Sequence, residues 1–503
     1  MSLFKSISWF LAAVLLAKIV GMAQSFVIAK AMSPESFGVW VTLLLIVSYS
    51  PIVALGAVET LVKEVPYYLG RKDFVSVKRV ERSVLGCIVL AAAVILVLGG
   101  IAAWLPAEVL SFDPRLLWPF VWAVVTSCFT GYFYWRLTAY ECFGSVAAVD
   151  TCRSIFSMLF VGGMAWVWGL WGAVLGYLVQ ELITFLIAAG ISVRKQGAVG
   201  VSFERGLLIH AVKVGFPITL LWWVLTLQAG VDRVVLGGMV GPAAVGLYGV
   251  GISLTGALAL VPMVVGRVLY PRVNREHGKG GIGESLKSVV IAPTLALGAL
   301  LINLQLFILA CLPILFEWIL PKYHEGLAAA QLLIIGSYFV CLLRNGANYL
   351  IATHNERRFL KFLLLALAFN VVVDVAFVQW GWGIEGIAIG TSLAGLLLTT
   401  LVWRAVFAGF GFSATAGRKR LMTLYAPILI LMGTLGALRL LYASFFHTFG
   451  VGSIVAYFVL LALINAGLWC LPTYRSEMQR WRERARWGMA ALGIAPRAAD
   501  PAS

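Results

Sequence analysis

The sequence predicts an all-α polytopic membrane protein with about 14 transmembrane helices, in two six-helix lobes followed by an extra C-terminal helix pair. Composition is the first observation: 61% of the 503 residues are hydrophobic and 12% are charged, against about 25% charged in a typical soluble domain. The second is a series of continuous apolar runs, each long enough to cross a bilayer as a helix; a strand would alternate instead. The third is an internal repeat.

Two short sequence patterns occur twice in the chain and indicate the repeat. The segment Pro34-Glu35-Ser36-Phe37-Gly38-Val39-Trp40 returns as Pro242-Ala243-Ala244-Val245-Gly246-Leu247-Tyr248, with glycines 208 residues apart. The pattern Gly169-x-x-Gly172-x-x-x-Gly176 returns as Gly383-x-x-Gly386-x-x-x-Gly390, 214 residues later. Small residues at this spacing favour close helix packing. Because six helices separate equivalent points, we predict a parallel repeat about an axis along the membrane normal.

The apolar runs place the individual elements. We predict spans at 8–30, 38–62, 83–105, 115–138, 151–170, 172–193, 214–236, 243–268, 288–312, 327–351, 359–380, 384–407, 421–443 and 451–472. The repeat then predicts an N-terminal lobe (1–193), a cytoplasmic linker (194–213), a C-terminal lobe (214–410), an additional helix pair (411–472) and a basic cytoplasmic tail (473–503).

The net charge of +16 is concentrated in alternate loops, for example at Arg71 and Lys72, at Arg194 and Lys195, and at Arg418, Lys419 and Arg420. This distribution follows the positive-inside rule rather than the pattern of a nucleic-acid-binding protein, so we expect no nucleic-acid partner. It predicts that both termini are cytoplasmic. Residues 1–31 resemble a signal peptide. Their apolar stretch, however, is longer than the apolar core of a signal peptide and contains Lys18, so we expect an uncleaved first helix.

Motifs for enzymatic chemistry are missing from the sequence. It contains neither G-x-x-x-x-G-K-[ST] nor H-E-x-x-H, and its seven cysteines include no C-x-x-C pair. We therefore expect a protein that is not an enzyme, with no cofactor, no bound metal site and no disulfide framework.

Several segments resemble the polysaccharide flippases of the MOP exporter superfamily. They are Ser33-Pro34-Glu35-Ser36-Phe37-Gly38, Asp232-Arg233-Val234-Val235-Leu236-Gly237, Val245-Gly246-Leu247-Tyr248, Val268-Leu269-Tyr270-Pro271-Arg272, Pro313-Ile314-Leu315 and Pro321-Lys322-Tyr323. The resemblance implies a MATE-like fold with a central cavity. It also implies transport of isoprenoid-pyrophosphate-linked oligosaccharide to the outer leaflet of a bacterial inner membrane, for cell-surface polysaccharides such as O-antigen or exopolysaccharide.

The partners expected on this basis are the lipid-linked oligosaccharide, membrane lipids, and a polysaccharide polymerase with its chain-length regulator. Two alternatives remain open. A cation-coupled multidrug or small-molecule antiporter of the same superfamily would share the fold. A membrane polysaccharide polymerase or ligase would also have many spans, but it would carry a long outer loop, and the outer loops here are short.

Cationic and polar residues inside spans are candidates for a substrate cavity, because a charge in the bilayer costs about 2.5–3.5 kcal/mol on insertion scales. An Arg or Lys there can bind pyrophosphate through charge-assisted hydrogen bonds. The alternative is that each cation pairs with a carboxylate or reaches the membrane interface. The candidates are Lys18 and Ser25 in the first span, Thr226 and Arg233 in the seventh, and Arg344 and Asn348 in the tenth, within a stripe that also holds Ser337 and Cys341.

Carboxylates inside spans are candidates for coupling transport to an ion. They are Asp374, Asp232 and Glu59. Each has a structural alternative: Glu59 is four residues from Lys63 and could pair with it, Asp232 is next to Arg233, and Asp374, which has no adjacent cation, could pair with a cation elsewhere in the chain.

Overall fold

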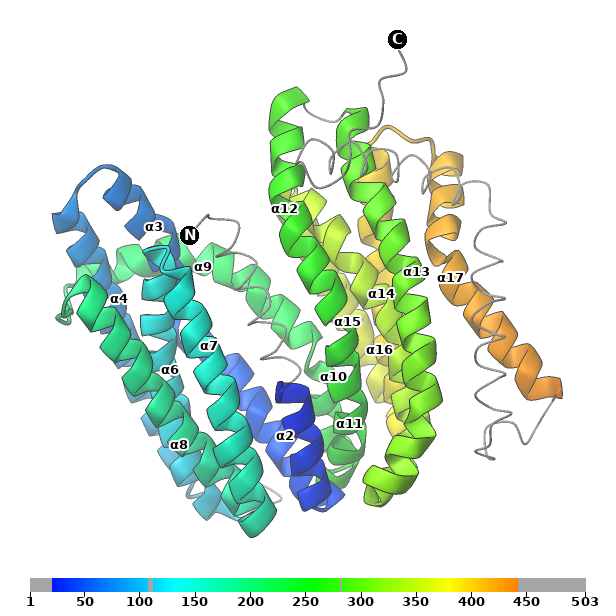
Figure 1. Cartoon of the computed structure of the whole chain (residues 1–503), viewed down its shortest axis with the longest axis horizontal. Coiled ribbons are helices and arrows are strands. Elements are labelled where there is room, and N and C mark those ends of the chain that lie inside the picture. Colours follow the sequence, from blue (N-terminus) through cyan, green and yellow to red (C-terminus); the bar gives the residue numbers. More distant parts are fainter. Residues whose placement is uncertain (1–19, 107–111, 281–282, 442–503) are drawn as a thin grey trace, which may run out of the picture. The chain divides into compact units, whose positions relative to one another are not determined.

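The computed structural model describes residues 20–106, 112–280 and 283–441, and within these ranges the regular structure is entirely helical (Figure 1). The first described helix is Val20–Ala31. The main elements that follow are α2 (Pro34–Tyr49), α3 (Ala57–Gly70), α4 (Phe74–Ala102), α6 (Leu117–Ala139), α7 (Phe143–Phe156), α8 (Gly163–Gln196), α9 (Arg205–Gln228), α10 (Val231–Met239), α11 (Pro242–Leu258), α12 (Leu260–Gly280), α13 (Glu284–Ile314), α14 (Leu327–Ala352), α15 (Glu356–Gln379), α16 (Gly383–Gly409) and α17 (Ala414–Leu441).

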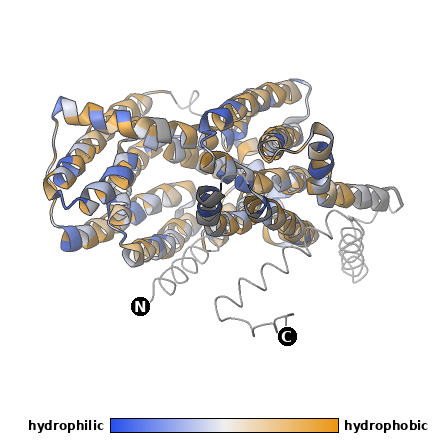
Figure 2. Ribbon diagram, turned by 90° about the horizontal axis from the view of Figure 1, so that it is seen from above, coloured by the Kyte–Doolittle hydropathy of each residue, from blue (hydrophilic) through white to orange (hydrophobic). Residues whose placement is uncertain are grey.

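Many of these helices have the length and hydropathy of membrane spans. In the described residues nine helices pass that test, or ten when the two halves of α9, bent by 53°, count as one span. Much of the ribbon of these helices has the colour of hydrophobic residues in Figure 2. One of the nine is the stretch Phe143–Gln196, which holds two predicted spans joined at Gly169, where the backbone has φ 59°. The predicted polytopic helical fold is confirmed. The fourteenth predicted span, 451–472, lies outside the described residues.

Several spans start earlier than the hydropathy pattern predicts. Helix α4 begins at Phe74 rather than 83, and α7 begins at Phe143 rather than 151. The second predicted span is interrupted at Leu55 and Gly56, both with positive φ, so that α2 and α3 are separate helices. The early turns contain charged residues that are paired within the fold, and a hydropathy window excludes such residues from a span.

The described chain forms two compact units. One comprises the described residues up to Ala257 with Trp318–Ala330 and Leu367–Gly390, and the other comprises Leu258–Glu317, Gln331–Ala366 and the described residues from Thr391. We call them unit one and unit two. Unit one therefore combines helices of the predicted N-terminal lobe with α9, α10, α11 and parts of α14, α15 and α16.

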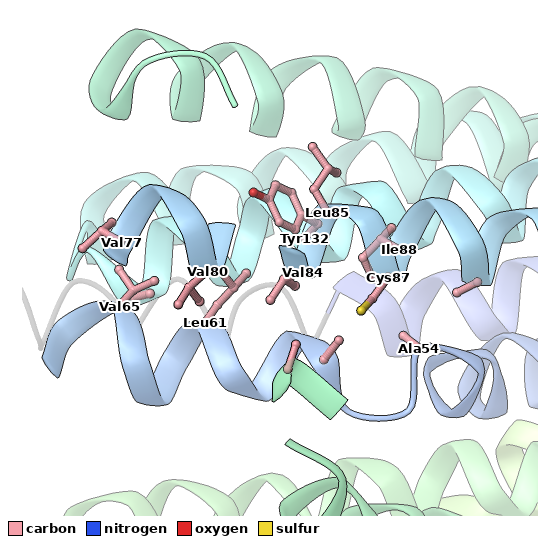
Figure 3. Close-up of a cluster of buried hydrophobic side chains, with 14 residues drawn as sticks. Ala54, Leu61, Val65, Val77, Val80, Val84, Leu85, Cys87, Ile88 and Tyr132 are labelled. Atoms are coloured by element: carbon pink, nitrogen blue, oxygen red, sulfur yellow. The ribbon is translucent and has the colours of Figure 1, made fainter. Parts of the chain in front are cut away.

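Unit one contains a hydrophobic cluster between α3, α4 and α6 (Figure 3). Leu61 and Val65 of α3 face Val77, Val84 and neighbouring residues of α4, and all of these side chains are buried. Burying such a side chain contributes about 1.5–3 kcal/mol in water-based accounts, although in lipid the gain comes from packing. The cluster holds three helices of this unit in fixed positions.

A buried ion pair crosses the same helices. Arg136 of α6 donates to Glu81 of α4 over 2.7 Å, and both side chains are completely buried. The Arg136 guanidinium also donates to Ser192 of α8 and to the carbonyls of Gln196 and Gly197. Because each polar group has a partner, this network can exist inside the protein.

The extended stretch 197–204 connects α8 to α9 and is tied to α4. The amide of Ser202 donates to the carbonyl of Arg82. The hydroxyls of Ser83 and Thr60 then donate to the carbonyls of Leu207 and Ala211, one turn apart on α9. The first half of α9 is therefore bound to α3 and α4 by polar contacts.

Unit two is held by hydrogen bonds from small polar side chains to backbone carbonyls of a neighbouring helix, a common device between membrane helices. Ser392, Thr399 and Trp403 of α16 donate to the carbonyls of Leu332, Phe339 and Leu342 of α14. On the opposite side of α14, Gln305 of α13 donates to the carbonyl of Ile334 over 2.6 Å.

Candidate functional site

Two buried carboxylates from different helices form the centre of a polar cluster in unit one. Asp232 lies in the first turn of α10 and is 2% exposed. It accepts hydrogen bonds from the hydroxyl of Tyr248 at 2.9 Å and from the amide of Arg233 at 2.8 Å. The Arg233 side chain is 3.7 Å from the carboxylate and donates instead to the carbonyl of Ala229. The charge of Arg233 therefore lies beside the carboxylate of Asp232, its neighbour in the sequence.

Asp374 of α15 is the second carboxylate and is fully buried. Its Oδ2 accepts a 2.7 Å hydrogen bond from the side-chain amide of Asn370. The side-chain oxygen of Asn370 in turn accepts a hydrogen bond from the side-chain amide of Gln228, at the end of α9. Its Oδ1 has no hydrogen-bond partner among the described residues. Gly390 of α16 lies against this oxygen, and a Cβ at that position would overlap it. Gly390 belongs to the repeated glycine motif, and because it has no side chain the carboxylate of Asp374 fits against it.

Further oxygens without partners belong to the same cluster. The Gln228 Oε1 and the hydroxyl of Tyr49 are both buried and make no hydrogen bond within the part of the chain that the structure describes. Asp232 acts electrostatically on both Asp374 and Tyr49, so the groups are near one another. Two carboxylates with one adjacent arginine, surrounded by unpaired oxygens, are suited to a small hard cation or a proton. The sequence predicted Asp232 and Asp374 as ion-coupling candidates, and the structure brings them into one cluster.

Arg344 of α14 is the main cationic candidate in unit two. It is exposed on a helix whose neighbouring positions are almost all buried. Its side chain passes over Gly266 of α12, where a Cβ would lie 3.1 Å from Nε. Asn348, one turn further on, donates to the carbonyl of Gly266. Ser337 and Cys341 of the predicted stripe are buried, so the accessible part of the stripe is Arg344 with Asn348.

A second arginine inside a span, Arg153, was missed by the sequence analysis. It lies on α7, donates to the fully buried Glu181 of α8, and keeps 44% of its side chain exposed. The apolar exposed residues Ala148 and Ile155 mark one face of α7, and Arg153 lies roughly 160° away from Ile155 at 100° per residue. Arg153 is therefore paired with Glu181 and partly exposed on a different face of α7 from Ile155. Its depth in α7 was the signal that could have identified it.

The remaining candidates have local roles or lie outside the described residues. Ser25 and Thr226 donate to the carbonyls four residues before them, Gly21 and Trp222, within their own helices. Glu59 forms no ion pair with Lys63 in the described structure, so the proposed pairing is not observed. Lys18 is outside the described residues.

A family model described as polysaccharide biosynthesis protein matches residues 3–277, which is more than half of the chain. This region contains both copies of the Pro-x-x-x-Gly signature and the Asp232 segment. No curated protein matches the sequence.

Solved structures match over most of the chain. A structure of the lipid II flippase MurJ in an inward closed conformation superposes with a TM-score of 0.69 at 14% identity, covering 92% of this chain and 98% of its own. An inward-facing multidrug resistance MATE family transporter of the MOP superfamily gives 0.60 at 14% identity, covering 81% and 95%. A point mutant of the Vibrio cholerae MATE transporter VcmN gives 0.53 at 15% identity, covering 81% and 98%.

These relatives share a fold rather than close sequence similarity, and they are membrane transport proteins rather than enzymes. The prediction of a MATE-like helical fold is confirmed. The chain belongs to the polysaccharide biosynthesis protein family and has the membrane fold of the MOP superfamily.

Proposed function

We propose that this protein flips an isoprenoid-pyrophosphate-linked oligosaccharide across the bacterial inner membrane by alternating access. The observation that carries the proposal is the family match over residues 3–277, within a fold shared with a lipid flippase. The substrate combines a polyprenyl tail, a pyrophosphate and a large glycan. Its head group requires a polar path through the membrane, and the tail can stay in lipid.

Exposed arginines within spans support this substrate class. Arg344, one turn from Asn348, and Arg153, which pairs with Glu181, are exposed arginines within helices that have the length and hydropathy of membrane spans. Arg binds phosphate through two parallel hydrogen bonds and remains charged at any physiological pH. In the proposed mechanism these residues attract the pyrophosphate, and Lys18 contributes a further charge from the first span.

The test of the function uses both cells and purified protein. A strain without the gene should accumulate lipid-linked oligosaccharide on the cytoplasmic leaflet while its synthesis continues. Purified protein in vesicles should move a fluorescent lipid-linked oligosaccharide between leaflets, as read by loss of accessibility to an added glycosidase. Normal polymer export by the deletion strain, with no second flippase present, would show that the proposal is wrong.

The first mutational prediction concerns Arg344. The Arg344→Gln substitution is expected to reduce flipping strongly while the protein accumulates normally, because a charge that binds substrate is lost. Arg344→Lys should keep partial activity, since a point charge still attracts phosphate without the bidentate geometry. Lys18→Gln and Lys18→Arg should behave in the same way. Flipping is measured in vesicles, and abundance by immunoblot.

A matched control is Arg404→Gln, which removes another exposed arginine, on α16. It should leave flipping near the wild-type rate. Full flipping by a Lys18→Gln, Arg344→Gln double variant at normal abundance would remove both residues from the substrate path. Low abundance with normal activity per molecule would indicate a structural ion pair instead.

The Asp232–Asp374 cluster supports coupling of the transport cycle to a cation. A cation that binds one conformation more tightly than the other shifts the population toward that conformation. The oxygen-rich, buried surroundings of Asp374 fit Na⁺ or a proton, and the thermal stability of the purified protein distinguishes these two.

The same cluster also fits a cation-coupled antiporter for small molecules, which is the second candidate function. The two candidates differ in their cargo. Flipping of lipid-linked oligosaccharide without efflux of cationic dyes supports the first, and dye efflux from intact cells without a glycan defect supports the second.

The membrane orientation is a separate prediction, which follows from the basic residues in alternate turns. Reporter fusions at the turns around residues 72, 200, 355 and 411 should report the cytoplasm, and fusions around 113, 241 and 381 should report the outer side. Reversal of two or more sites would contradict the orientation.

A polysaccharide polymerase and a chain-length regulator are the proposed protein partners, and they should co-purify after mild crosslinking.

A further inference from the structure

A polar pocket lies between α3, α4 and the first half of α9, within unit one, and we call it the α3–α4–α9 pocket. Its volume is about 210 Å³. One water needs only ~10–15 Å³, and the sites of drug-sized ligands measure ~300–1,000 Å³. The pocket therefore has room for a small ligand, in the size class of a monosaccharide. Its polar walls include Thr60, Glu64, Ser76, Arg79, Ser83 and His210.

The walls of this pocket are held in fixed positions. Val80 and Ala211 belong both to the pocket and to the hydrophobic cluster of unit one, and Figure 3 shows Val80 among the buried side chains of that cluster. The hydroxyls of Thr60 and Ser83 donate to carbonyls of α9 and connect it to α3 and α4. A ligand therefore meets groups that are already in place, which lowers the entropy that binding costs.

The buried part of the pocket offers hydrogen-bond acceptors. Glu64 Oε1 is hydrogen-bonded to the ring Nε2 of His210 at 2.9 Å. Glu64 Oε2 is buried and has no hydrogen-bond partner among the described residues. Thr60 and Ser83 are also buried, and each hydroxyl already donates its one proton to a carbonyl, so its oxygen can only accept further hydrogen bonds. These groups suit a ligand with several O–H donors.

The exposed part of the pocket carries cationic and donor groups. Arg79 of α4 and His210 of α9 are the exposed residues of the polar wall. Arg79 acts electrostatically on Asp73, but both oxygens of that carboxylate already accept hydrogen bonds from Ser76. An arginine guanidinium can donate two parallel hydrogen bonds to a phosphate. This side of the pocket therefore suits an anionic group with several oxygens.

We infer that the α3–α4–α9 pocket binds a phosphorylated sugar, with its hydroxyls donating to Glu64 and its phosphate bound by Arg79 and His210. A simple anion would leave Glu64 Oε2 without a donor and beside a second negative charge. A simple cation would meet the positive charge of Arg79. A phosphorylated sugar supplies donors and an anion in one small molecule. The inference goes beyond the proposed transport, since Arg153 and Arg344 are not among the residues that line this pocket.

The phosphorylated sugar can come from two sources. A soluble sugar phosphate would enter from the cytoplasm, because the turn 71–73 between α3 and α4 is on the side that the loop charges predict to be cytoplasmic. The sugar next to the pyrophosphate of a lipid-linked oligosaccharide has the same chemistry and would enter from the membrane. In the first case the pocket senses a metabolite, and in the second it contacts the transported lipid.

Binding is tested with purified wild-type protein and glucose 1-phosphate as the probe, by titration calorimetry and by the shift in melting temperature. Glucose 1-phosphate should bind saturably. Glucose and inorganic phosphate should each bind at least roughly tenfold more weakly, since each lacks part of the contacts. Absence of saturable binding, or equal affinity for inorganic phosphate and glucose 1-phosphate, would overturn the inference.

Two substitutions locate the binding in the pocket. Arg79→Gln and Glu64→Gln should each weaken binding of glucose 1-phosphate by roughly tenfold or more, because each removes a charge-assisted hydrogen bond. Arg79 is exposed, so its replacement should leave the fold intact. The matched controls are Arg71→Gln, at the end of α3, and Glu204→Gln, before α9, and both residues are exposed outside the pocket. They should keep wild-type affinity. Unchanged affinity in either Arg79→Gln or Glu64→Gln would overturn the inference.

A lipid-linked oligosaccharide in detergent distinguishes the two sources. Displacement of glucose 1-phosphate by this lipid would assign the pocket to the transported substrate, and Arg79→Gln should then slow flipping in vesicles. Absence of displacement would assign the pocket to a soluble metabolite, and Arg79→Gln should then flip at the wild-type rate. Flipping by wild-type protein that does not bind the probe would overturn the inference and leave the proposed function standing. Binding of the probe without flipping would support the pocket and overturn the function.

Discussion

Replacing Arg136 by methionine is expected to remove most of the protein from the membrane, because the buried Glu81 then keeps only the partly exposed Lys78 as a cationic partner. Both side chains are completely buried, and Arg136 joins α4, α6 and α8. Breaking a buried pair from one side costs about 3–5 kcal/mol, which is a large part of the ~5–15 kcal/mol that stabilises a typical domain. The measurement is the amount of protein in the membrane, with a melting curve in detergent where enough is recovered.

The double variant Glu81→Leu, Arg136→Met separates the charge effect from simple loss of packing. It removes both charges, so it should recover part of the abundance, although Ser192 and Tyr140 lose a partner. The matched control is Glu284→Gln, in an i, i+3 pair with Lys287 near the surface. Such a pair contributes at most about 1 kcal/mol. Normal abundance of Arg136→Met alone would show that the buried network is not needed for folding.

The same network shows which parts of the fold the sequence could predict. Apolar runs predicted a polytopic helical membrane protein, because about 20 apolar residues are needed to cross the bilayer as a helix. They predicted starts for α4 and α7 that are too late, since Glu81 and Asp150 interrupt the apolar pattern although both are inside helices. Their partners Arg136 and Tyr134 come from α6, so spacing along one segment contains no sign of these contacts.

The candidate site was predictable to a similar extent. Asp232 and Asp374 stand out in the sequence because carboxylates are rare in spans. That they share one cluster depends on the contact between the end of α9 and α15, which one sequence does not encode in any local pattern. The repeated glycine motifs predicted close packing, and Gly390 indeed lies against Asp374. Gly38 of α2 contacts the other copy of its own motif, in α11, a relation that only the folded chain reveals.

The last prediction tests the cation site directly. In purified wild-type protein, Na⁺ should raise the melting temperature relative to choline at equal ionic strength, because a ligand that binds only the folded state stabilises it by RT ln(1 + [L]/Kd), about 2.7 kcal/mol at one hundred times Kd. Asp374→Asn should remove this stabilisation, since the unpaired Oδ1 is the most available ligand in the described cluster. Asp232→Asn should weaken it as well and also disturb the contact with Tyr248. The control Asp113→Asn changes a carboxylate that caps a short helix near the surface, and it should keep the full response to Na⁺.

If the wild-type protein responds to pH but not to Na⁺, and Asp374→Asn removes the pH response, the coupling ion is a proton. Retention of the wild-type response to both Na⁺ and pH by Asp374→Asn and Asp232→Asn would exclude this cluster as the coupling site.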